Sequence, residues 1–275
     1  MKFAKFIIVA VLALIFFTGC AEMQQGSGST SSSPVLDRIQ KRGQLIVGTM
    51  GGMPPLNMTA KDGEIFGLEA DLARLMAGAM GVKVKFVVKP FPELLPALES
   101  GQVDMVLSGM TITPNRNLKV AFVGPYFVSG KAFLTKIKTI AQAKDAAEVN
   151  SPDTKLVALR GSTSQAFAES VLDKTTLHTT GTYDEAVDMV LNDKVQAMIA
   201  DYPICVVSVF RYPEAGLLSV VTPLTYEPIG IAIPANDPLL MNWTTNTLNN
   251  IEASGMLDKL RLKWFARGEW LDKLK

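Results

Sequence analysis

The sequence predicts an α/β protein made of two doubly wound lobes, and three observations support this. Short apolar runs of strand length alternate with apolar residues at helical spacing, which indicates mostly parallel sheets flanked by helices. Two such series occur, one before and one after residues 124–130. The chain has 275 residues, 48% of them apolar, and is therefore long enough for two domains of medium size.

The amino terminus has the pattern of a secretory signal. A basic start with Lys2 and Lys5 precedes an apolar stretch at 6–17 that is too short to span a bilayer comfortably. Gly19 and Cys20 then resemble the end of a lipobox. We therefore expect residues 1–19 to be a signal peptide, and Cys20 to carry acyl chains that anchor the protein stably to a membrane.

Charge excludes some classes of partner. Loss of residues 1–19 would remove two lysines and no acid, so the mature chain would have 25 basic and 26 acidic side chains, a net charge of −1. A nearly neutral chain without a basic cluster is not expected to bind nucleic acid, or to bind a membrane surface through a polybasic segment.

Metal and nucleophile chemistry also lack support in the sequence. Cys205 lies among apolar neighbours, which predicts a small buried side chain rather than a nucleophile. His178 stands alone in a polar, threonine-rich stretch. We expect no metal, no cofactor and no catalytic residue.

The first series of elements follows a Gly- and Ser-rich linker at 20–34, which we expect to be a flexible tether. Asp62 and Gly63 predict a hairpin-type turn within the series. Apolar spacing and glycine or proline boundaries then predict a helix near 36–40, strands at 44–49, 82–88 and 103–107, and helices at 68–79 and 93–100.

The second series follows residues 124–130. It is predicted to contain strands at 155–159, 197–200 and 230–234, and helices at 139–149, 164–172, 183–192, 203–212, 238–254 and 256–265.

The motif Ser108–Arg116 carries the strongest functional signal. It follows an apolar strand, so it lies at the edge where open α/β sheets bind ligands. Gly109 would let a ligand approach the backbone, Thr111 offers a hydroxyl, and Arg116 offers a planar set of donors that suits a carboxylate. The alternative is that Pro114 opens a helical turn and Arg116 is a solvated surface cation. The pattern favours a receptor for a small carboxylate.

The same motif resembles S-G-M-[ST]-I-T-x-x-R of the family 3 extracytoplasmic solute-binding proteins, which are amino-acid receptors of ABC importers. Ordered matches cover about residues 36–266. They include Gly67–Asp71, Leu95–Asp104, Leu159–Thr163, Asp201, Glu227–Ala232 and Gly255–Phe265.

The resemblance implies a periplasmic-binding-protein-like fold of type II, a venus flytrap in which a two-strand hinge joins the lobes. Lobe 1 would comprise 35–130 and 230–275, and lobe 2 would comprise 131–229. Ligand bound between the lobes would select the closed form.

The resemblance also implies a ligand site. Arg116, Thr111 and the backbone at Gly109 would hold the ligand carboxylate from lobe 1. Ser162 and Thr163 would add donors from lobe 2, because they begin a helix whose free N–H groups favour an anion; both also suit helix caps alone.

Two further residues complete the implied site. Asp201 would pair with the ligand α-ammonium, although an acid at a helix start also satisfies free N–H groups. Phe91 falls where the family places an aromatic wall, with a packed core residue as the alternative.

The side-chain pocket is expected to be apolar, lined by Met53, Leu56, Phe91 and Met110. Met50 stands where many relatives have an aspartate, which disfavours a cationic ligand. We therefore expect an uncharged, moderately apolar amino acid or a related carboxylate. Arg160, which could reach the cleft, leaves an acidic side chain possible.

Two other functions remain open. Residues 36–43 and Gly48–Gly51 are also similar to cyclohexadienyl dehydratases; there Arg116 would hold a carboxylate of prephenate or arogenate, and Glu227 would protonate the departing hydroxyl.

A sensory adaptor is the other alternative, but sensors of this family usually continue into a transmembrane helix, whereas this sequence stops at Lys275. The preferred interpretation is a monomeric, lipid-anchored receptor on the periplasmic or extracellular face that delivers its ligand to an ABC permease.

Overall fold

The structure is a computed structural model that describes residues 33–220 and 223–274. The expected signal peptide, the lipidation site at Cys20 and most of the expected tether lie outside the described residues. Pro34, the last residue of the expected tether, is instead the first residue of helix α2 (Pro34–Arg42). Ser33 just before it is buried, and its hydroxyl donates to Asp237 Oδ1 at 2.6 Å.

The first sheet has five strands in the order β5-β1-β6-β13-β7. Their bounds are β1 (Gln44–Thr49), β5 (Lys83–Val88), β6 (Met105–Val106), β7 (Val120–Ser129) and β13 (Glu227–Pro234). β1 runs parallel to β5 and β6, whereas β13 is antiparallel to β6 and β7. The sheet is therefore mixed, because a strand from late in the chain is inserted between β6 and β7.

Helices and a small hairpin sheet surround this first sheet. They are α3 (Leu68–Ala79), η1 (Phe91–Glu93), α4 (Leu94–Glu99), α5 (Pro114–Asn117), α10 (Pro238–Ala253), α11 (Met256–Phe265) and η4 (Leu271–Lys273), with β2 (Gly52–Met53), β3 (Asn57–Thr59) and β4 (Ile65–Phe66). The last two long helices return to this sheet, since α10 contacts β7 and α2 and α11 contacts α3.

The second sheet has the order β10-β9-β11-β8-β12. Its strands are β8 (Lys131–Thr135), β9 (Lys155–Leu159), β10 (Thr176–Thr180), β11 (Ala197–Asp201) and β12 (Leu218–Ser219). Its helices are α6 (Lys138–Ala141), η2 (Ala146–Val149), α7 (Thr163–Val171), α8 (Tyr183–Leu191), α9 (Tyr202–Arg211) and η3 (Pro213–Ala215). β9 runs parallel to β10 and β11, whereas β8 is antiparallel to β11 and β12.

One predicted helix in this region is wrong. The helix expected at 139–149 is two short pieces, α6 and η2. Asp145 has extended backbone angles, and its side chain accepts a hydrogen bond from Ala147 N. An aspartate that caps a new turn in this way competes with helix continuation, which separates the two pieces.

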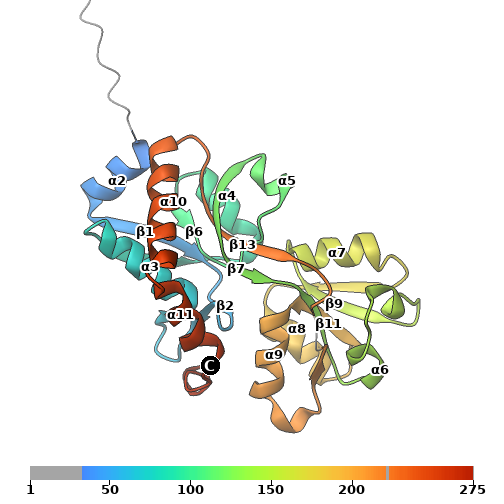
Figure 1. Cartoon of the computed structure of the whole chain (residues 1–275). Helices are drawn as coiled ribbons and strands as arrows, with labels where there is room; N and C mark the ends of the chain where they lie inside the picture. The colour runs from blue at the N-terminus through green and yellow to red at the C-terminus, as the bar shows by residue number, and fades with distance from the viewer. Residues whose placement is uncertain (1–32, 221–222, 275) are drawn as a thin grey trace, which may run out of the picture. The chain divides into compact units, whose positions relative to one another are not determined.

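Two long strands link the two lobes. β7 and β13 pair along most of their length, with Glu227 opposite Ser129 and a bulge between Ile229 and Ile231. β8 of the second sheet starts at Lys131, so the chain passes from one sheet to the other within two residues. Figure 1 shows β7 and β13 running side by side between the lobes.

Apolar side chains fill both lobes, and Cys205 is among them. Its thiol is fully buried and lies 3.7 Å from the carbonyl oxygen of Ala132, which confirms the predicted small buried side chain, and burial raises its pKa. Among the described residues, no helix combines the length and apolar character needed to cross a membrane.

Candidate functional site

Arg116 is held in place by the motif that contains it. Thr113 caps the short helix α5 by accepting from Arg116 N at 3.2 Å. The guanidinium turns back to donate from Nη1 to the Thr111 carbonyl oxygen at 2.8 Å, and it lies 5.6 Å from the Phe91 ring centroid. Pro114 does open a helical turn, but Arg116 is not a freely solvated cation.

Arg116 also reaches the second lobe. Its Nη2 donates to the carbonyl oxygen of Gly161 at 3.4 Å. Burial lowers the pKa of the guanidinium, and the charges of Asp201 and Glu227 oppose that shift. Arg116 of the first lobe and Asp201 of the second, the two charged groups expected to bind the ligand, are therefore close enough to interact electrostatically.

Asp201 ends β11, and its carboxylate does not act as a helix cap. It occupies the N-cap position of α9, yet its side chain makes no capping hydrogen bond. Its Oδ1 instead accepts from Lys131 Nζ at 2.8 Å. The alternative in which Asp201 merely satisfies helix N–H groups is therefore not what the structure contains.

Lys131 is a site residue that sequence reasoning missed. Its side chain has no exposed surface, although it carries an ammonium group. Besides Asp201, Nζ donates to Thr163 Oγ1 at 2.6 Å and lies 3.3 Å from Glu227 Oε2. Oxygen atoms of three side chains thus surround the ammonium, as a buried charge requires. A lysine that opens the otherwise apolar strand β8 was the available signal.

Thr163 connects this cluster to the first lobe. Its hydroxyl lies 3.4 Å from the hydroxyl of Thr111 and donates to Glu227 Oε2 at 3.1 Å. Glu227 in turn accepts from Thr225 Oγ1 at 3.1 Å through its other oxygen. A continuous series of polar contacts therefore runs from the arginine motif to the buried lysine.

The hydroxyl of Ser162 is used within its own lobe. It caps α7 by accepting from Gln165 N at 3.1 Å, and it donates to the Leu159 carbonyl oxygen at 2.7 Å. Of the two residues expected before α7, Thr163 is therefore the one whose side chain faces the other lobe.

Gly109 also differs from its expected role. Its φ of +59° and its position suit glycine, because a Cβ would lie 2.0 Å from the Met53 sulfur. Its N–H donates to Glu69 Oε1 at 2.6 Å rather than being free for a ligand. Burial raises the pKa of Glu69, which also accepts from Asn57 Nδ2 at 2.6 Å and from the Tyr126 hydroxyl. This network fixes the arginine motif to the hairpin sheet and to β7.

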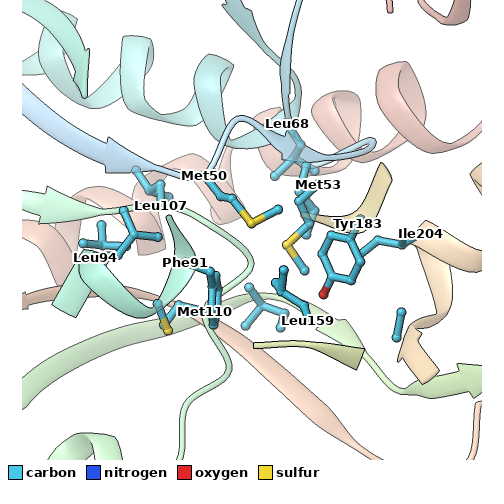
Figure 2. Packing of buried hydrophobic residues seen from close by; sticks show 14 of the residues in the cluster. Met50, Met53, Leu68, Phe91, Leu94, Leu107, Met110, Leu159, Tyr183 and Ile204 are labelled. Atoms are coloured by element: carbon cyan, nitrogen blue, oxygen red, sulfur yellow. The ribbon is translucent and has the colours of Figure 1, made fainter. Parts of the chain in front are cut away.

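A buried apolar cluster lies beside the polar cluster, with Phe91 5.6 Å from the Arg116 guanidinium. Figure 2 shows Met53 next to Tyr183, and α8 contacts β2, so the apolar cluster draws on both lobes. Burial raises the pKa of Tyr183, so its hydroxyl stays neutral. The buried apolar residues are Met50, Met53, Leu56, Phe91 and Met110 from the first lobe, and Leu159, Tyr183 and Ile204 from the second. Arg160, considered as a cleft residue, is exposed.

Comparison with known proteins agrees with this architecture. A structure from Wolinella succinogenes, described as a binding component of an ABC transporter complexed with lysine, is 38% identical over 84% of this chain and 100% of that chain, with a TM-score of 0.80. The ancestral amino acid-binding protein AncCDT-1, a precursor of cyclohexadienyl dehydratase, is also 38% identical, covers 84% and 99%, and has a TM-score of 0.77.

Similar sequences include both a binding protein and an enzyme. A probable histidine-binding protein of Neisseria gonorrhoeae is 27% identical over 78% of this chain and 80% of its own length. The cyclohexadienyl dehydratase of Pseudomonas aeruginosa is 22% identical over 91% and 93%. The sequence model of the family called bacterial extracellular solute-binding proteins, family 3, matches residues 45–267. The chain therefore belongs to family 3 of the bacterial extracellular solute-binding proteins, with the type II two-lobe fold.

Proposed function

We propose that this protein is an extracytoplasmic receptor that binds an amino acid with an uncharged, moderately apolar side chain between its lobes and delivers it to an ABC permease. The observation that carries the proposal is the placement of Arg116 and Asp201. They come from different lobes, Arg116 donates across to Gly161, and Thr163 two residues on shares the Lys131 ammonium with Asp201. A zwitterion offers a carboxylate to Arg116 and an ammonium to Asp201. A ligand with both groups would thus be gripped by both lobes at once.

Free hydrogen-bonding capacity supports this assignment. Arg116 uses two N–H groups on the carbonyl oxygens of Thr111 and Gly161, and a guanidinium has five, so three remain for a carboxylate. Within residues 33–220 and 223–274, the Asp201 carboxylate accepts a hydrogen bond only through Oδ1, which leaves Oδ2 for an ammonium. The buried apolar cluster beside these groups would suit an uncharged ligand side chain.

The lobe boundaries near residues 130 and 230 belong to the same proposal. The motif is coupled to the linking strands, because Ile112 N donates to the Pro228 carbonyl oxygen at 2.8 Å and Gly230 N donates to the Met110 carbonyl oxygen at 3.1 Å. Ligand held by Arg116 would therefore act directly on strand β13, which lies between the lobes. Closure around a ligand would bend the chain at these strands.

The enzyme alternative makes a separate demand on Glu227. A general acid must donate a proton to the departing hydroxyl. Here both Glu227 oxygens serve as acceptors, from Thr163 and Thr225, with the Lys131 ammonium alongside. This arrangement favours a fixed acceptor and hence a receptor over a dehydratase.

The test is a calorimetric screen of the purified protein against the amino acids and against related carboxylates. Saturable binding of neutral amino acids in the micromolar range or tighter is the expected result. Tight binding of arginine with none of any neutral amino acid would overturn the ligand class. Formation of phenylpyruvate from prephenate, followed by ultraviolet absorbance, would replace the receptor by the dehydratase.

Attachment to the membrane through Cys20 completes the proposal. Metabolic labelling with a radioactive fatty acid is expected to mark the protein, and Cys20→Ser is expected to abolish the label and to release the protein from the membrane fraction. A labelled Cys20→Ser variant would refute lipidation at this residue.

A further inference from the structure

We propose that Lys131 determines the charge class of the ligand: it cancels one of the two carboxylates in the site, and the site therefore prefers uncharged over cationic amino-acid side chains. This inference rests on the proposed function, because it concerns the same site. It adds a specificity-determining residue that does not itself lie among the expected ligand contacts.

The charges around Lys131 balance. Arg116 and Lys131 supply two positive charges, and Asp201 and Glu227 supply two negative ones. Among the described residues, the side chains of Tyr183 and Cys205 also act on this group, and burial raises the pKa of both, so both are neutral. The four charged groups thus sum to zero, which matches a zwitterion whose side chain carries no charge.

The burial of Lys131 makes this balance a fixed property of the site. Its side chain has no exposed surface, whereas the side chain of Lys136 on the same lobe is 27% exposed and pairs with Asp193, itself 79% exposed. Water screens a surface charge strongly and a buried one weakly. Lys131 therefore acts on a ligand between the lobes, and Lys136 does not.

Removal of the ammonium would leave one uncompensated carboxylate. In Lys131→Met the four groups would sum to minus one, so a ligand with a cationic side chain would gain an attraction that it lacks in the parent protein. For a separation of about 8 Å and an effective dielectric constant of about 20, that attraction corresponds to a change in affinity of ~30-fold.

Matched ligands isolate this effect. Citrulline has nearly the shape of arginine without its charge, and norleucine has the chain length of lysine without its ammonium. Calorimetry on the full-length protein in detergent should show that Lys131→Met shifts the preference between arginine and citrulline, and between lysine and norleucine, by about tenfold or more toward the cation. Lys136→Met, which removes the same charge from the surface, should leave both ratios unchanged.

A second variant covers the case in which Lys131→Met does not fold, since it removes the ammonium that lies between Asp201 and Glu227. Glu227→Gln keeps the lysine and shifts the sum to plus one, so it should move the preference toward glutamate over glutamine by a similar factor. The double variant Lys131→Met with Glu227→Gln restores a sum of zero and should return the arginine to citrulline ratio to that of the parent.

The outcomes separate this inference from the proposed function. If the parent protein binds no amino acid, the proposed function fails. If it binds neutral amino acids but neither Lys131→Met nor Glu227→Gln changes the charge preference, the function stands and the role of Lys131 is refuted. A parent protein that already prefers arginine to citrulline would also refute it.

Discussion

Replacement of Arg116 by glutamine tests the carboxylate anchor. Glutamine retains a polar group but has no charge and cannot present the planar set of donors that matches a carboxylate. The three N–H groups left free by Thr111 and Gly161 allow two charge-assisted hydrogen bonds to the ligand. At about 1.5–3 kcal/mol each, their loss amounts to roughly 3–6 kcal/mol, or an affinity lowered by about 10²- to 10⁴-fold.

The assay is calorimetry with the tightest neutral amino acid, together with the melting temperature. Arg116→Lys should fall between the parent and Arg116→Gln, because an ammonium keeps the charge but not the paired donors. Arg160→Gln is the matched control, since Arg160 is exposed, and it should bind like the parent. If a folded Arg116→Gln binds within threefold of the parent, Arg116 is not the anchor.

Three further changes test the supporting structure. Gly109→Ala should lower the free energy of unfolding by about 1–3 kcal/mol in chemical denaturation, because its Cβ would clash with Met53. The control is Gly43→Ala, which has a similar positive φ but open space around the Cβ, so it measures the cost of the backbone conformation alone. Burial raises the pKa of the Glu69 carboxyl above 4.5, so the folded state holds its proton at pH values where the unfolded state has lost it. Stability should therefore fall as the pH rises from 4.5 toward the folded pKa. Glu69→Gln should flatten this fall in melting temperature, and an unchanged slope would contradict the pKa shift. Ser33→Ala should cost about 1–3 kcal/mol by leaving a buried carboxylate short of a donor, and an unchanged denaturation midpoint would refute that role.

Local sequence patterns predicted most of the regular elements. β1 and β9 occupy the predicted residues, as does α11, because apolar periodicity and glycine or proline boundaries mark both ends. β8 and β10 were missed. The apolar run of β8 is only three residues long and follows a buried lysine, and β10 is a polar strand paired with β9 alone.

The candidate site was predicted only in part. The fold brings together four of the predicted residues, Arg116, Thr111, Thr163 and Asp201. Their contacts join distant parts of the chain, so no local sequence pattern predicts which residue contacts which. Lys131 was missed because its role depends on partners 32, 70 and 96 positions away along the chain. Long-range pairing of charges leaves no periodic trace in a sequence, so tertiary structure was needed to find it.

A crystal structure with the tightest-binding amino acid would test the central claim most directly. The expected result is a ligand between the lobes, with its carboxylate on the guanidinium of Arg116 and its ammonium within hydrogen-bonding distance of Asp201 Oδ2. A ligand bound elsewhere, for example in the 510 Å³ cavity beside Phe210 and Trp264, with Arg116 and Asp201 making no contact to it, would contradict the account.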